Sequence, residues 1–168
     1  MAKFEESKMT FEFPDMDFYY VEKSPLLATL EGMSTCECIV NLRGRITLIE
    51  AKSSSPSPKN DMDFHRFIGE ISQKFNDTLV FYNAVRMRQR DEHLPENLSN
   101  IDLRKASYEM FLIVHGHKIE WLPPLMDALK KNLKSVLRLW NISDVSVKVI
   151  NEQIAKSKGL SLFKAFDK

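Results

Sequence analysis

The chain has 168 residues, of which 43% are hydrophobic and 28% are charged, and its formal net charge is +1. This length is typical of one domain and is enough to bury about 70% of the surface that the unfolded chain would expose. The near-neutral charge excludes a polycation that attracts nucleic acid through its overall field. Any phosphate binding must therefore come from local clusters of charge.

Cellular location is predicted from three features. The longest strongly apolar run, residues 110–114, is too short to span a bilayer. Acidic residues stand near the start, where a signal peptide would need its apolar core. The only cysteines, Cys36 and Cys38, are expected on one face of one strand, which suits a disulfide poorly. We expect a reduced, cytoplasmic protein that does not associate with membranes.

The first third of the chain contains few regular patterns. Residues 1–17 mix aromatic, acidic and basic residues without a clear period, and we expect an adaptable N-terminal arm. Residues 18–21 are aromatic and β-branched, which predicts a short strand. Ser24 followed by Pro25 is a typical helix start, and it predicts a helix as far as about Gly32.

A β-hairpin is predicted next. Residues 35–42 and 45–52 are rich in isoleucine, valine, leucine and threonine, and Arg43-Gly44 between them has the length of a tight turn. The serine- and proline-rich residues 53–58 cannot continue a strand and predict an exposed loop.

The remaining elements are predicted from hydrophobic periodicity. A long helix is expected from Asp61 or Asp63 to about Arg90, because apolar residues recur there at three- and four-residue steps. Beyond a polar stretch, we expect the remaining strands and the second amphipathic helix at residues 108–115, 121–140 and 145–150.

This order predicts an α/β fold of the mixed α+β kind, with a single-layer mixed central sheet built around a hairpin or meander and flanked by helices. We expect one domain over residues 1–168, with a core at 18–150 and a basic C-terminal tail at 151–168.

The hairpin register brings charged residues together. Counting back from the turn places Glu37 opposite Glu50, with side chains on the same face and Cβ atoms about 4.5–5.5 Å apart. Lys52, two residues beyond Glu50, points to that face as well. Two opposed carboxylates repel each other unless a cation lies between them, and a hard divalent cation such as Mg²⁺ would balance them.

Glu37, followed after twelve residues by Glu50-Ala51-Lys52 on the second hairpin strand, resembles the PD-(D/E)XK nuclease superfamily. The resemblance covers about residues 18–114 and implies a restriction-endonuclease-like core, namely a helix, a three-stranded meander, a helix and a further strand. It implies that Glu37 and Glu50 bind the metal, that the carbonyl of Ala51 is a third ligand, and that Lys52 is the catalytic lysine.

Accessory residues follow from the same resemblance. Some members place a glutamine or lysine on the helix after the hairpin, which suggests Gln73 or Lys74, although a solvated polar face explains these residues equally well. The acid that is often found on the family's first helix has only Glu22 and Glu31 as substitutes. The first hairpin acid is also glutamate where aspartate is commoner.

The sequence therefore predicts a Mg²⁺- or Mn²⁺-dependent nuclease acting on nucleic acid, with DNA favoured over RNA. The rival hypothesis is a non-catalytic pseudo-nuclease or protein-interaction module, in which the acids form an ordinary salt-bridge ladder at a strand end. A hydrolase acting on another phosphate compound would keep the site and change the substrate. The oligomeric state, with a homodimer as one option, stays open.

Overall fold

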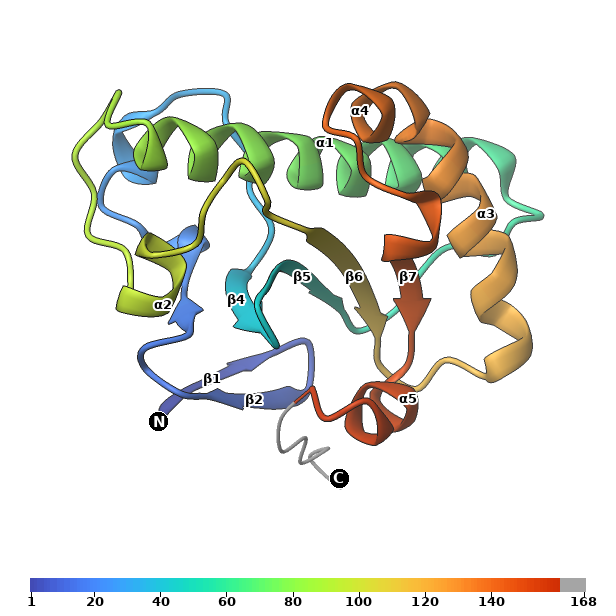
Figure 1. Ribbon diagram of the computed structural model, residues 1–168. Coiled ribbons are helices and arrows are strands. Elements are labelled where there is room, and N and C mark those ends of the chain that lie inside the picture. Colours follow the sequence, from blue (N-terminus) through green and yellow to red (C-terminus); the bar gives the residue numbers. More distant parts are fainter. Residues whose placement is uncertain (161–168) are drawn as a thin grey trace.

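The structure is a computed structural model that describes residues 1–160, and it has two sheets and five α-helices within that range (Figure 1). The strands are β1 (Ala2–Glu6), β2 (Met9–Phe13), β3 (Phe18–Tyr19), β4 (Cys38–Leu42), β5 (Arg45–Lys52), β6 (Tyr108–Val114) and β7 (Val147–Ile150). The helices are α1 (Asp61–Arg86), α2 (Glu96–Ser99), α3 (Leu122–Asn132), α4 (Lys134–Leu139) and α5 (Glu152–Ser157). Short 3₁₀ helices are η1 (Val21–Lys23), η2 (Leu27–Thr29), η3 (Ile119–Trp121) and η4 (Asp144–Ser146).

The main sheet has five strands in the order β3-β4-β5-β6-β7. The first three strands form an antiparallel meander, whereas β6 runs parallel to β5 and β7 runs parallel to β6. The long α1 makes the crossover between β5 and β6, which is how two parallel neighbours are usually connected. The predicted mixed α/β fold with a mixed central sheet is confirmed.

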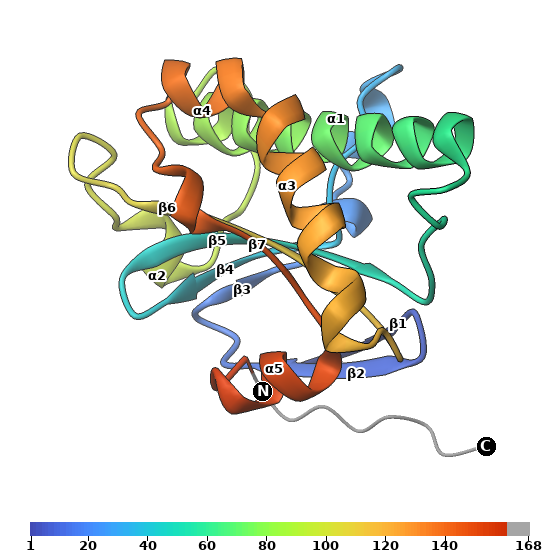
Figure 2. The same ribbon diagram turned by 90° about the vertical axis from the view of Figure 1, so that its right-hand side faces the viewer.

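Helices α1, α3 and α4 cover one face of this sheet (Figures 1 and 2). The periodic apolar stripe that predicted α1 faces the sheet: Phe75, Leu79 and Tyr82 are fully buried in one cluster with the side chains of Ile39 and Leu48. The periodic residues form one buried face because residues three and four apart lie on the same side of a helix.

The other face is covered by the β1–β2 hairpin and α5, which pack with Val40, Ile49 and Ile113 (Figure 2). The expectation of an adaptable arm over residues 1–17 was wrong. Phe11 and Phe13 are buried there, and the hairpin turns at Ser7-Lys8, which both have positive φ. Serine and lysine are no signal for such a turn, because asparagine and glycine are the residues that it favours.

Two predicted helices differ from those in the structure. The helix expected from Ser24 to Gly32 is one turn of 3₁₀ helix, η2, although the Ser24 hydroxyl accepts the backbone N–H of Leu27 in the expected capping position. The helix expected at 121–140 divides into α3 and α4 at Leu133. Backbone hydrogen bonds continue through Leu133, so the division is a kink.

The two cysteines do not share a face, contrary to the prediction. Strand β4 begins only at Cys38, so the alternation of a strand does not extend back to Cys36. The side chain of Cys36 packs beneath α1, whereas that of Cys38 packs beneath the β1–β2 hairpin. Both thiols are free and fully buried, and burial raises the pKa of each.

The predicted C-terminal tail contains α5, which is capped by the Asn151 side chain accepting the backbone N–H of Ile154. Residues 161–168 of that tail lie outside the described residues. Among residues 1–160, no helix combines the length and the apolar composition needed to cross a membrane.

Candidate active site

The hairpin that positions the predicted site has the expected register. Leu42 pairs with Arg45 and Cys38 pairs with Ile49. Arg43 and Gly44 form the turn, with φ values of 53° and 79°. The paired register ends at Cys38, and Glu37 forms a bend immediately before β4, close enough to Glu50 for the negative charge of Glu50 to raise the pKa of Glu37. The turn therefore sets which residues of the two strands face each other.

Glu50 is completely buried and binds two lysines. Its Oε1 lies 2.8 Å from Nζ of Lys52 on its own strand and 2.8 Å from Nζ of Lys74 on α1. Its Oε2 has no hydrogen-bond partner among the described residues. A carboxylate without solvent is costly unless it is paired, and two ammonium groups more than balance one negative charge.

Lys74 keeps its charge in this environment. Burial lowers the pKa of its ammonium group, but the negative charges of Glu50, and then those of Glu37 and Glu22, outweigh burial and raise the pKa overall. The site therefore places a fixed positive charge from the helix beside the one from the strand.

Glu37, in contrast to Lys74, has an environment that disfavours its charged form. Its side chain is buried with one oxygen, Oε2, lacking any partner among the described residues. Burial, a hydrogen bond with Glu22 and the negative charges of Glu50, Glu22 and Glu6 raise the pKa of the Glu37 carboxyl from 4.5 to about 9. Glu37 therefore holds a proton at neutral pH unless a cation replaces it.

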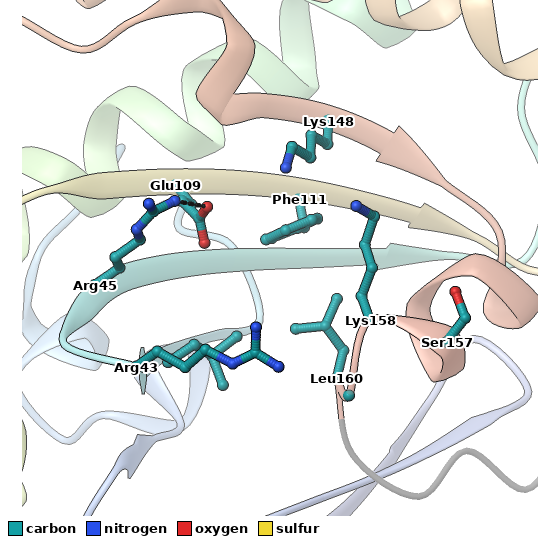
Figure 3. A pocket seen from close by; sticks show the side chains of 10 residues that line it. Arg43, Arg45, Glu109, Phe111, Lys148, Ser157, Lys158 and Leu160 are labelled. Carbon is teal, nitrogen blue, oxygen red and sulfur yellow. Dashed lines mark hydrogen bonds and ion pairs between the residues drawn. The ribbon is translucent and has the colours of Figure 1, made fainter.

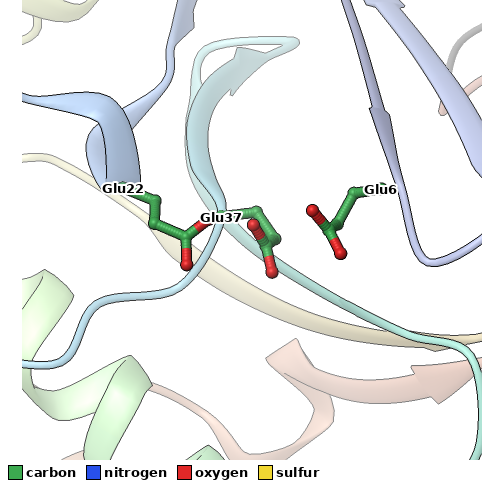
Figure 4. Close-up of side chains that lie close together, drawn as sticks. All are labelled: Glu6, Glu22 and Glu37. Atoms are coloured by element: carbon green, nitrogen blue, oxygen red, sulfur yellow. The ribbon is translucent and has the colours of Figure 1, made fainter.

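Three carboxylates meet at this point from separate segments (Figure 4). Oxygens of Glu6 at the end of β1, Glu22 in η1 and Glu37 lie within 4.8 Å of one another. The backbone N–H of Glu22 also donates to the carbonyl of Glu37 at 3.3 Å, which holds η1 against the start of β4.

This donor set fits a hard divalent cation. Mg²⁺, Mn²⁺ and Ca²⁺ prefer oxygen ligands, and carboxylates supply both the oxygens and the compensating charge. The buried Oε2 of Glu37 has no hydrogen-bond partner among the described residues, so it is available as a ligand once the carboxyl loses its proton. The residues present are therefore compatible with the Mg²⁺ or Mn²⁺ that the sequence predicted.

The residues of the site differ in their exposure to solvent. Glu22 is exposed, Glu6 is half-buried, and the Lys52 side chain is 32% exposed, whereas that of Glu50 is fully enclosed. A substrate could therefore contact Lys52, Glu22 and Glu6 directly. It would not contact Glu50, which is enclosed and would act only through the lysines that it binds.

The other predicted site residues divide into two groups. Lys74 binds Glu50, and Glu22 lies with Glu6 and Glu37 in the group of acids. Gln73 instead donates to Asp77 at 2.6 Å, and Glu31 is exposed at a separate shallow pocket beside Asp77.

The Ala51 carbonyl, expected as a metal ligand, accepts the hydroxyl of Ser7 at 3.0 Å. The same hairpin turn brings in Glu6, which was not predicted. Nothing in the sequence pointed to Glu6, because its position depends on where the β1–β2 hairpin docks.

Searches against protein-family models, curated proteins and solved structures found no match to this chain. Its function is therefore inferred from the geometry of the site.

Proposed function

We propose that the protein is a metal-dependent nuclease that hydrolyses phosphodiester bonds, with DNA as the favoured substrate. The observation that carries the proposal is the pairing of opposite charges in one place: Glu50 binds two lysines, and beside it Glu37 has a buried oxygen without a partner among residues 1–160. Metal-dependent hydrolysis of a phosphodiester needs acidic residues that bind the cation. It also needs positively charged groups that stabilise the phosphate, and ammonium groups can fill this role.

The order of elements supports assignment to the PD-(D/E)XK superfamily. The antiparallel meander β3-β4-β5, the helix α1 and the strand β6 follow one another as in the core of that superfamily. A departure is that the β1–β2 hairpin, and not a helix, precedes the meander. Glu22, which would replace the acid of the missing helix, lies after β3 instead.

Each residue has a role in this proposal. Glu37 and Glu22 would hold the cation with Glu6 beside them, and Glu50 could add its unpaired Oε2. When bound, the cation would polarise the phosphodiester and acidify a water molecule. Lys52 and Lys74 would orient the attacking water and stabilise the negative charge that develops on the phosphate.

The test is cleavage of single- and double-stranded DNA and RNA by the full chain, with Mg²⁺, with Mn²⁺ and with EDTA. We expect metal-dependent cutting that falls by at least about 100-fold in both Glu37→Gln and Lys52→Met, because each change removes charge from the reacting centre. Glu31→Gln is the matched control and should keep full activity. Cutting that survives Lys52→Met would place the activity elsewhere, and circular dichroism establishes that each variant is folded.

Two observations favour the non-catalytic alternative: the Ala51 carbonyl already accepts a hydrogen bond from the Ser7 hydroxyl, and both lysines are already paired with Glu50. It predicts no cutting and no cation-dependent stabilisation. Under the nuclease proposal, a cation at 100 times its dissociation constant should stabilise the fold by about 2.7 kcal/mol. That gain should disappear in Glu37→Gln and persist in Glu31→Gln.

A further inference from the structure

A second group of charged residues lies on the face of the main sheet that α1 does not cover. A pocket of about 560 Å³ opens between the Arg43-Gly44 turn, β6, β7 and the residues after α5. The side chains of Arg43, Arg45, Lys148 and Lys158 line it, and Glu109 is the one acid among the described residues of its lining (Figure 3). Positive charge is therefore concentrated here in a chain whose net charge is only +1.

Within the described part of the chain, only one of the four cations is neutralised. Nη1 of Arg45 lies 2.7 Å from Oε1 of the buried Glu109, and no ion pair joins Arg43, Lys148 or Lys158 to any residue between 1 and 160. Three cations that face one hollow repel each other and attract anions. The balance of charge thus favours a ligand with more than one negative charge.

The wall of the pocket contacts one of these cations, Lys148. The ring of Phe111 lies near the amino groups of Lys148 and Lys158 in Figure 3, and Nζ of Lys148 is 5.7 Å from the centre of the phenyl ring. Phe111 itself is buried, so it serves as the floor of the pocket. A cation above an aromatic ring is weakly attracted to it, which restricts the lysine.

Arg43 occupies an unfavourable backbone conformation. Its φ of 53° lies in the left-handed region, where glycine and asparagine are preferred at this position of a tight hairpin turn. Its guanidinium group extends along the pocket toward Gly159, where an added Cβ would lie 3.8 Å from Nη2 of Arg43. Backbone strain of this kind often accompanies function, and here it accompanies a cation at the pocket.

We propose that this pocket binds the phosphate groups of a nucleotide, either free or within a nucleic-acid strand. Arginine and lysine are the usual phosphate ligands, and the volume is in the range of small-molecule sites. The proposal goes beyond the nuclease site, because Glu50, Lys52 and Lys74 lie on the α1 side of the sheet. Either site can exist without the other.

The test is isothermal titration calorimetry of the full chain with pyrophosphate, with ATP and with a short single-stranded oligodeoxynucleotide. EDTA is present throughout, so that a cation in the acidic cluster cannot contribute. We expect saturable binding that weakens at least tenfold in the double variant Arg43→Asn, Lys148→Gln. Lys131→Gln on the exposed side of α3 is the matched control and should bind as the natural chain does.

The probes distinguish the two sources of phosphate. Binding of ATP and pyrophosphate would indicate a free nucleotide, whereas binding of the oligonucleotide alone would indicate a strand. No saturable binding of any probe would overturn the proposal. Equal weakening in the Lys131→Gln control would overturn it too, since the attraction would then be to surface charge in general.

Discussion

The Glu37 carboxyl illustrates how the surroundings of one residue change its chemistry. In water a glutamate is ionised at neutral pH, but burial and three neighbouring acids raise the pKa of Glu37 to about 9. Its proton is held more tightly in the folded chain than in the unfolded chain. Protonation of Glu37 therefore stabilises the fold at low pH, and this contribution is lost as the pH rises from the unfolded pKa near 4.5 toward 9.

The pH dependence of stability should reveal this proton. In EDTA, the free energy of unfolding of the natural chain should fall, relative to that of Glu37→Gln, as the pH rises from about 5 to about 9. Chemical denaturation at a series of pH values measures this difference. Glu31→Gln should follow the natural chain, because Glu31 is exposed and outside the cluster. A constant difference between Glu37→Gln and the natural chain would show that Glu37 titrates as an ordinary glutamate.

Within the elements, the Arg43-Gly44 turn sets the register on which the site depends. The side chain of Asn41 supports the turn by accepting the backbone N–H of Gly44 at 2.9 Å. Positive φ values at both turn positions match the right-handed twist of the two strands. A slip of one residue would move Glu50 and Lys52 to the opposite face of the sheet.

Replacing the turn residue should separate stability from ligand binding. Arg43→Asn is expected to raise the free energy of unfolding by about 0.5–1 kcal/mol, since asparagine tolerates the left-handed conformation better than arginine. The same change should weaken phosphate binding. Thermal or urea unfolding measures the first effect, and Arg43→Val, which is β-branched, should be destabilised instead. A less stable Arg43→Asn would mean that the strain at this turn is negligible.

At the scale of the whole molecule, the β1–β2 hairpin decides how enclosed the candidate site is. Phe4, Phe11 and Phe13 bury it against the main sheet, and its turn contributes Glu6 to the acids and Ser7 to the Ala51 carbonyl. The hairpin is therefore part of both the core and the site.

Removing one of its anchors tests this arrangement. Phe11→Ala should lower the free energy of unfolding by about 3–5 kcal/mol, as expected for a fully buried phenyl ring. Glu5→Ala, an exposed position on the same hairpin, should change it by less than about 0.5 kcal/mol. A loss below about 1 kcal/mol in Phe11→Ala would show that this hairpin contributes little to the stability of the core. Urea denaturation followed by circular dichroism is a suitable measurement.

The sequence by itself determined the elements whose signals are local. The stripe on α1 repeats with the helical period, and the strands of the β4–β5 hairpin are joined by a tight turn, so both could be predicted without any distant contact. The register then placed Glu50 and Lys52 on one face. Lys74 was only one of several polar residues on α1 that could have met them.

The tertiary structure alone decided which residues from distant segments meet. Glu6, Glu22 and Glu37 come from segments with no pattern linking them, and their meeting depends on docking of the β1–β2 hairpin and of η1. The basic pocket likewise joins Arg43 to Lys148 and Lys158, more than 100 residues apart in the chain. Such clusters arise from the packing of elements, which depends on long-range burial and not on the local periodicity that a sequence displays.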